Sequence, residues 1–183
     1  SNRFEWVHKR ADNDETFHAD VQLNSMKVNG KIILQAVVRD ISRFKEQEQR
    51  VQHLAFYDPL TGLANRRLMD IKLDQAIAEC KRNKSWGALI FMDLDHFKTI
   101  NDDHGHTAGD HLLVQVAERL KHQLREVDTL VRYGGDEYIV ILSQVGSSPR
   151  QANKQALIVA EKLRIEMSTP FSVQQLSEDV DKD

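Results

Sequence analysis

The chain has 183 residues, of which 40% are hydrophobic and 29% charged, as expected of a globular protein that buries a core. Its 25 basic and 28 acidic side chains give a net charge of −3, which argues against general nucleic-acid binding, because such binding needs a basic surface. The single cysteine excludes an internal disulfide framework and is typical of a reducing, cytoplasmic compartment. Uninterrupted apolar runs are far shorter than the roughly 20 residues of a membrane span, so we expect none in this segment. The chain begins with Ser, and we expect it to belong to a longer protein, which leaves an upstream membrane anchor open.

Residues 17–41 predict a β-hairpin. Apolar and polar residues alternate from Phe17 to Leu23, the pattern of a half-buried strand, and residues 31–41 predict a second, more buried strand. Asn29 and Gly30 between them tolerate the positive φ angles of a tight turn. A hairpin is too small to be stable alone, so we expect its partners upstream of residue 1 or in another subunit.

Residues 42–56 contain no Gly or Pro and predict a helical linker. Five residues recur at alternating three- and four-residue spacing, as in a coiled-coil seam: Ile41, Phe44, Glu48, Val51 and Ala55. The charged Glu48 weakens this seam, and the alternative is a single amphipathic helix that packs on its own domain.

From residue 57 onward the pattern alternates between helix and strand, which predicts an α/β (α+β) fold with a sheet covered by helices. Asn65 is a candidate N-cap for the first helix, whose apolar face would carry Leu68, Ile71 and Ile77. The further elements expected are a buried strand at 87–94, a helix at 110–124, strands at 129–133 and 137–142, and a helix from Pro149 onward.

Two acidic clusters adjoin predicted strands. Asp93 and Asp95 follow the apolar run at 87–94, and Asp136 and Glu137 come directly after a pair of glycines in a tight hairpin. If the two strands are neighbours, these carboxylates converge, and hard oxygen ligands of this kind suit Mg²⁺ together with substrate phosphates. The alternative is that they are solvated turn residues.

Polar residues between the clusters offer groups for a nucleotide. Lys98 and nearby backbone N–H groups can hold phosphate, and Asn101 and Asp110 can pair with the edge of a base. Zinc is a weak alternative here, because the histidine spacing matches no usual zinc site and no cysteine accompanies it; the histidines are His96, His104, His106 and His111.

Arg125 and Asp128 lie three residues apart, before the glycine hairpin. They can form a surface salt bridge. Alternatively, the guanidinium binds phosphate or the guanine edge, and the carboxylate accepts from guanine N–H groups.

Three segments closely resemble, in order and spacing, the GGDEF domain of diguanylate cyclases: DPLTGLANRR (58–67), FMDLDHFKTINDDHGHTAGD (91–110) and RYGGDEYIVIL (132–142). The resemblance covers about residues 54–171 and implies a sheet similar to the palm of nucleotidyl cyclases and polymerases. The hairpin, which ends in RDIS at 39–42, is similar to the end of a PAS sensor domain. We therefore expect a PAS-like fragment at 1–42, a linker at 43–56 and a C-terminally incomplete GGDEF domain at 57–183.

The resemblance implies an enzyme that condenses two GTP molecules into cyclic di-GMP and releases pyrophosphate. Each domain of the family holds one GTP, so it also implies a homodimer, with Mg²⁺ or Mn²⁺ as cofactor. By motif, Asp93 and Asp136 would hold the metal with the Leu94 carbonyl, and Glu137 would support the metal and phosphate site. The remaining roles carried over are guanine recognition by Asn101 and Asp110, phosphate binding by Lys98 and the amides of His96 and Phe97, and product inhibition by cyclic di-GMP at the RxxD pair, Arg125 and Asp128.

The sequence departs from the family pattern at three places. Tyr138 replaces the Phe of the signature and brings a hydroxyl that needs a partner. Asp136 is a shorter variant of Glu, and the family's last strand and helix do not follow Phe171. An alternative is therefore a catalytically weak GGDEF domain that binds GTP or cyclic di-GMP and regulates an adjacent domain, for example a phosphodiesterase. A third is a sensory or dimerisation fragment without a nucleotide role.

Overall fold

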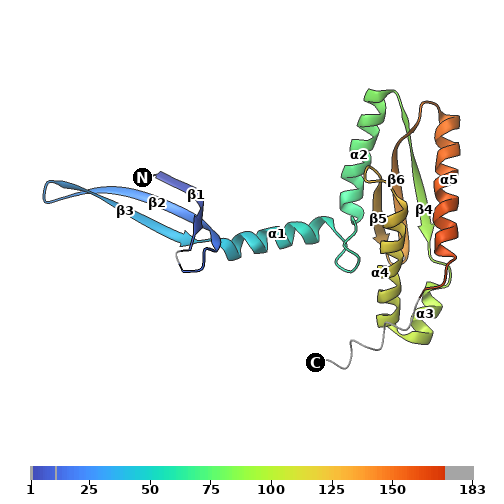
Figure 1. Ribbon diagram of the computed structural model, residues 1–183, viewed down its shortest axis with the longest axis horizontal. Coiled ribbons are helices and arrows are strands. Elements are labelled where there is room, and N and C mark those ends of the chain that lie inside the picture. Colours follow the sequence, from blue (N-terminus) through green and yellow to red (C-terminus); the bar gives the residue numbers. More distant parts are fainter. Residues whose placement is uncertain (1, 11, 172–183) are drawn as a thin grey trace. The chain divides into compact units, whose positions relative to one another are not determined.

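The computed structural model describes residues 2–10 and 12–171 (Figure 1). The chain forms two compact units, Ser1–His53 and Leu54–Asp183. Helices and strands are mixed throughout, so the α/β fold class predicted from the sequence is confirmed. Within the described residues, none of the helices is both long and apolar enough for a membrane span.

The first unit contains a three-stranded antiparallel sheet made of β1 (Asn2–Lys9), β2 (Thr16–Val28) and β3 (Lys31–Asp40) in that order. The predicted hairpin is confirmed, with Asn29 and Gly30 at positive φ angles of 49° and 79° in its turn. Two expectations were wrong. A partner strand lies within the chain, because β1 pairs with β2 along its whole length, and β3 is exposed rather than buried, because it is an edge strand.

Helix α1 (Ser42–Phe56) forms where the linker helix was predicted. An ion pair of 2.9 Å between Lys45 and Glu5 of β1 ties its first turns to the sheet. Phe44 and Val51 of the predicted seam are exposed, which is what a seam that meets a second helix requires. The coiled coil itself stays a prediction.

The second unit consists of α2 (Arg66–Asn83), β4 (Trp86–Asp93), α3 (Phe97–His104), α4 (His106–Gln123), β5 (Thr129–Gly134), β6 (Glu137–Gly146) and α5 (Pro149–Met167). Its antiparallel sheet has the order β4-β6-β5. Helix α2 lies on one face, and α4 and α5 lie on the other (Figure 1). The predicted elements are confirmed, except that α3 was not predicted and α4 begins four residues earlier than predicted.

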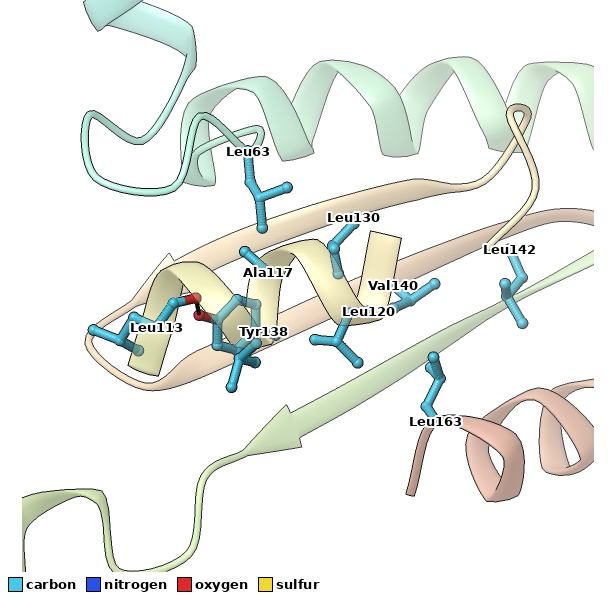
Figure 2. Close-up of a cluster of buried hydrophobic side chains, with 10 residues drawn as sticks. Leu63, Leu113, Ala117, Leu120, Leu130, Tyr138, Val140, Leu142 and Leu163 are labelled. Atoms are coloured by element: carbon cyan, nitrogen blue, oxygen red, sulfur yellow. Dashed lines mark hydrogen bonds between the residues drawn. The ribbon is translucent and has the colours of Figure 1, made fainter. Parts of the chain in front are cut away.

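The main core lies between β6 and the two helices α4 and α5 (Figure 2). Side chains of a strand alternate between its faces, so Tyr138, Val140 and Leu142 all point into this core. Ile139 points the other way, where it packs with Val131 in a smaller cluster under α2.

Strand β4 is an edge strand, so its prediction as a buried strand was wrong in part. Ile90 and Met92 pack against the main core, but Leu89 and Phe91 on the opposite face are 41% and 71% exposed. Helix α2 covers this face of the sheet only in part, so Leu89 and Phe91 remain exposed.

Helix α2 begins at the predicted cap, where the Asn65 side chain accepts a hydrogen bond of 3.1 Å from the Leu68 backbone N–H. Leu68 packs against the smaller cluster as expected. Ile71 and Ile77 were expected on the same buried face but are exposed, because only one narrow stripe of α2 contacts a sheet of three strands.

Candidate active site

The two acidic clusters lie at one end of the sheet. Strands β4 and β6 are neighbours as predicted, and Asp93 and Glu137 are directly opposite each other in the ladder. Opposite residues of an antiparallel pair share a face, so both carboxylates point to the same side of the sheet. Asp136 precedes Glu137 in the hairpin turn, which Gly135 closes with a φ of 53°.

The three carboxylates have no partner of opposite charge among the described residues. Within residues 2–10 and 12–171, no salt bridge or side-chain hydrogen bond involves Asp93, Asp136 or Glu137. Adjacent carboxylates repel each other, and a divalent cation with phosphate oxygens relieves that repulsion. Among the described residues, no group of three or more His, Cys, Asp or Glu side chains is arranged to hold a metal by itself, and this includes Asp93, Asp136 and Glu137. A cation here would need further oxygen ligands, such as a backbone carbonyl and substrate phosphates.

A cleft of about 730 Å³ opens beside the acidic end of β4. Asp93 and Asp95 line it from the strand side, and Arg164 and Ser168 line it from the C-terminal end of α5. Its volume is within the range of small-molecule sites, which span about 300–1,000 Å³.

The turn after β4 carries the predicted phosphate-binding groups. His96 adopts the left-handed conformation, with φ of 62°, and starts α3 without a side-chain cap. The Phe97 N–H donates to the Leu94 carbonyl at 3.2 Å, so a predicted phosphate donor and a predicted metal ligand are bonded to each other in the ligand-free chain. Lys98 is exposed on the first turn of α3.

Gly109 makes room for one of the two predicted guanine ligands, Asn101, and sequence reasoning missed it. Asn101 lies on α3 and Asp110 on α4, and Gly109 is buried where the two helices pack. A Cβ atom at Gly109 would lie 2.0 Å from Asn101 Oδ1 and 3.1 Å from Phe97 Cζ. The absence of a side chain there therefore gives the Asn101 carboxamide its place against α4, at the residue that precedes Asp110.

Tyr138 is fully buried below the acidic cluster, and its hydroxyl has the partner that it needs. The hydroxyl donates a hydrogen bond of 2.9 Å to the Leu113 carbonyl of α4 (Figure 2). Burial raises the pKa of the Tyr138 hydroxyl, so it stays protonated and acts as a donor. The Tyr-for-Phe departure is thus accommodated within the core.

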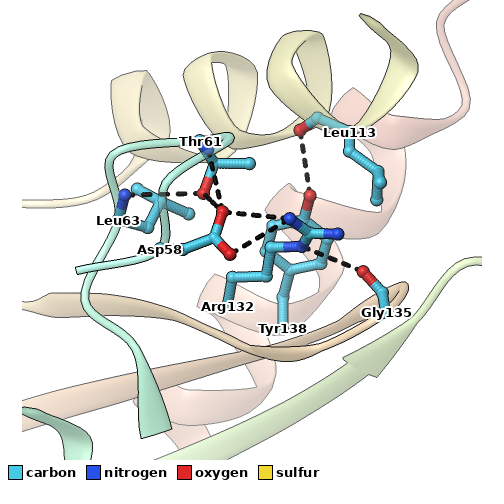
Figure 3. A network of polar contacts seen from close by, with 7 residues as sticks. All are labelled: Asp58, Thr61, Leu63, Leu113, Arg132, Gly135 and Tyr138. Carbon is cyan, nitrogen blue, oxygen red and sulfur yellow. Dashed lines mark hydrogen bonds and ion pairs between the residues drawn. The ribbon is translucent and has the colours of Figure 1, made fainter. Parts of the chain in front are cut away.

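A polar network behind the hairpin was also missed (Figure 3). Asp58 accepts hydrogen bonds from the Thr61 backbone and hydroxyl (2.8 and 2.7 Å) and pairs with Arg132 at 3.0 Å. Arg132 Nε in turn donates to the Gly135 carbonyl at 2.9 Å. Burial opposes ionisation of Asp58, but the Thr61 hydrogen bonds and the Arg132 ion pair outweigh it and lower the pKa of Asp58. The network therefore holds the turn that carries Asp136.

The RxxD pair forms a tight turn. The Arg125 backbone N–H donates to Asp128 Oδ2 at 3.2 Å, and Asp128 Oδ1 is buried without a hydrogen-bond partner. The Arg125 side chain is exposed, and among the salt bridges of the described residues none joins it to Asp128, so the predicted alternative of a side-chain salt bridge is not observed there. A pocket of about 380 Å³ adjoins the pair, and Lys72 and Lys121 also line it.

Residues 55–181, well over half of the chain, match the family described as diguanylate cyclase, GGDEF domain. The chain belongs to the GGDEF family. Among its relatives, the bifunctional diguanylate cyclase/cyclic di-GMP phosphodiesterase MucR of Pseudomonas aeruginosa is 42% identical over 120 residues, which are 66% of this chain and 17% of MucR. The diguanylate cyclase DgcM of Escherichia coli is 31% identical over 163 residues, 89% of this chain and 38% of DgcM. The chain thus corresponds to less than half of these relatives.

Solved GGDEF structures share the fold. A structure of TpbB (YfiN) from Pseudomonas aeruginosa that comprises only the GGDEF domain matches with a TM-score of 0.60 and 37% identity, over 66% of this chain and 67% of that one. The coiled coil and GGDEF domain of DgcB from Caulobacter crescentus, in complex with cyclic di-GMP, matches with a TM-score of 0.62 and 30% identity, over 72% and 66% of the two chains.

Proposed function

We propose that this GGDEF domain is a diguanylate cyclase module that condenses two GTP molecules into cyclic di-GMP. The observation that carries the proposal is the pairing of Asp93 with Glu137 at neighbouring strand ends, next to Asp136 in the chain, with no ion pair to any of the three carboxylates among the described residues. The relatives DgcM and TpbB, which are diguanylate cyclases, support it.

Asp93 and Asp136, with the Leu94 carbonyl, would hold Mg²⁺ or Mn²⁺. When bound, the cation lowers the pKa of the attacking 3′-hydroxyl and stabilises the charge on the departing pyrophosphate. Lys98 and the backbone at the start of α3 orient the triphosphate, which requires the bond between the Phe97 N–H and the Leu94 carbonyl to open or be shared. Most of the rate gain comes from this positioning and charge neutralisation.

Asn101 and Asp110 hold guanine by its hydrogen-bonding edge, where a carboxylate accepts from N–H groups and an amide both donates and accepts. Each domain presents one GTP, so two copies face each other for the reaction. We propose a homodimer through α1. The N-terminal sheet would act as a PAS-like sensor that changes the relative position of the two GGDEF domains.

We also propose that Arg125 and Asp128 bind the product and inhibit the enzyme. The buried Asp128 Oδ1 without a partner supports this, because a buried acceptor without a donor is costly and a guanine N–H group satisfies it. DgcB of Caulobacter crescentus has been solved with cyclic di-GMP bound.

The second candidate is a GGDEF domain that binds nucleotide and regulates an adjacent phosphodiesterase. The similarity to MucR, whose name gives both activities, favours it. Incubation of the purified chain with GTP and Mg²⁺, followed by chromatography of the nucleotides, separates the candidates. We expect cyclic di-GMP from the natural sequence and at least a ~100-fold loss in Asp136→Asn, since the cation site is lost. Tight GTP binding without product would favour the regulatory candidate.

A further inference from the structure

Helix α5 presents an apolar stripe to solvent that the core does not use. Leu157, Ile158 and Ile165 are 62%, 52% and 57% exposed, while Ala152 and Leu163 on the opposite side are buried. Large aliphatic side chains that share one exposed helix face are typical of an interaction surface.

The stripe lines a shallow groove of about 750 Å³ along α5. Lys162 donates to the Gln123 carbonyl of α4 at 3.0 Å and closes one side of this groove. The bases outnumber the acids at the N-terminal end of the groove, and the acids lie at its C-terminal end together with Lys162. Arg150 and Lys154 line its N-terminal half, and Glu161 and Glu166 line its C-terminal half. Arg164, the other base of the C-terminal half, pairs with Glu161 at 2.7 Å.

We infer that the α5 stripe is a self-complementary interface, on which α5 of a second copy packs antiparallel. With a twofold axis between Leu157 and Ile158, these two residues meet their counterparts, and Lys154 lies opposite Glu161 of the second copy. Arg150 then lies beside Ile165 and Glu166 of the second copy. An isologous contact uses each pairing twice, so the separation of charge along α5 favours this partner over an unrelated one.

The geometry makes this dimer unproductive, a consequence that rests on the proposed cyclase function. Arg164 lies at the cleft that holds Asp93 and Asp95, toward one end of α5. An antiparallel arrangement places the two clefts at opposite ends, separated along the helix by about 20 Å at a rise of 1.5 Å per residue. Reacting atoms must approach to about 3–3.5 Å, so the α5 dimer keeps the two GTP sites apart.

Site-specific cross-linking of the whole chain tests the interface. In a Cys80→Ser background, Ile158→Cys is treated with a bismaleimide that spans the roughly 8–10 Å between packed helices. The matched control is Ile71→Cys, an exposed apolar position on α2. We expect Ile158→Cys to cross-link about tenfold faster than the control, Lys154→Glu to slow it, and the double exchange Lys154→Glu/Glu161→Lys to restore it. Equal rates at residues 158 and 71, or no restoration by the double exchange, would overturn the interface.

The catalytic consequence has a separate measurement. The cross-linked Ile158→Cys protein is expected to make several-fold less cyclic di-GMP than the same protein capped with N-ethylmaleimide. Equal turnover would show that the dimer is productive and refute its resting role. If neither sample makes product but cross-linking follows the charge exchange, the interface stands and the cyclase proposal fails.

Discussion

Gly109→Ala offers a way to damage nucleotide binding without damaging the fold. An added Cβ lies 2.0 Å from Asn101 Oδ1, so the Asn101 side chain must move. The neighbour is the end of a flexible side chain rather than backbone, and Ala in a helix interior is favoured over Gly by about 0.8–1.0 kcal/mol. We therefore expect the free energy of unfolding to stay within about 1 kcal/mol of its original value, with the shift of the Phe97 ring offsetting the gain.

The expected loss is in guanine recognition. One lost hydrogen bond to a base edge is worth about 1–3 kcal/mol, which corresponds to a rise of roughly 5- to 150-fold in the KM for GTP. Steady-state kinetics with GTP, alongside urea unfolding, measure both quantities. Asn101→Ala is the matched comparison, and Gly109→Ala should add little to it because both changes remove the same contact. An unchanged KM in a folded Gly109→Ala variant would refute the placement of Asn101 at the base, and additive losses would show that Gly109 acts by another route.

Three further predictions concern the scaffold and the regulatory site. Tyr138→Phe removes the hydrogen bond to the Leu113 carbonyl and should lower the free energy of unfolding by about 1 kcal/mol with little change in turnover; a large loss of activity would give the hydroxyl a catalytic role. Folding lowers the pKa of Asp58, so ionised Asp58 stabilises the folded protein fully at a pH above its pKa in the unfolded chain, about 4. This stabilisation is lost as the pH falls through the pKa of Asp58 in the folded protein. The difference in urea stability between the natural sequence and Asp58→Asn should therefore shrink from pH 7 to pH 3, and a constant difference would contradict the ionised Asp58, bonded to Thr61 and Arg132, as its source. Arg125→Ala should raise the cyclic di-GMP concentration needed for half inhibition, whereas unchanged inhibition would count against the RxxD assignment.

Elements with a strong local signal were predictable from the sequence. Asn65 and Pro149 mark helix starts by their side chains alone, and apolar runs with adjoining glycines defined β4, β5 and β6. Two elements lacked such a signal. Strand β1 is short of apolar residues, and its main support is its pairing with β2, which the sequence of β1 alone does not indicate. Helix α3 is eight residues long, mostly polar, and is held by its contact with α4.

The sequence predicted that the two acidic clusters lie at one end of the sheet, because the strands next to them were expected to be neighbours. What the sequence could not show was which neighbours hold these groups in place. Asp58 and Arg132 are 74 residues apart, and nothing in either segment alone indicates the other. The space for Asn101 depends on Gly109, which is visible only when α3 and α4 are packed together.

The Asp58–Arg132 pair connects the scaffold to the proposed chemistry. Arg132 donates to both the Asp58 carboxylate and the Gly135 carbonyl, so one guanidinium joins the loop before α2 to the turn that carries Asp136. Gly135 has a positive φ, and a glycine turn without such a bond is free to adopt several conformations. The bond to Arg132 restricts the turn that leads into the pairing of Glu137 with Asp93. A carboxylate pair must be held in this way before a cation arrives, because its own repulsion otherwise drives it apart.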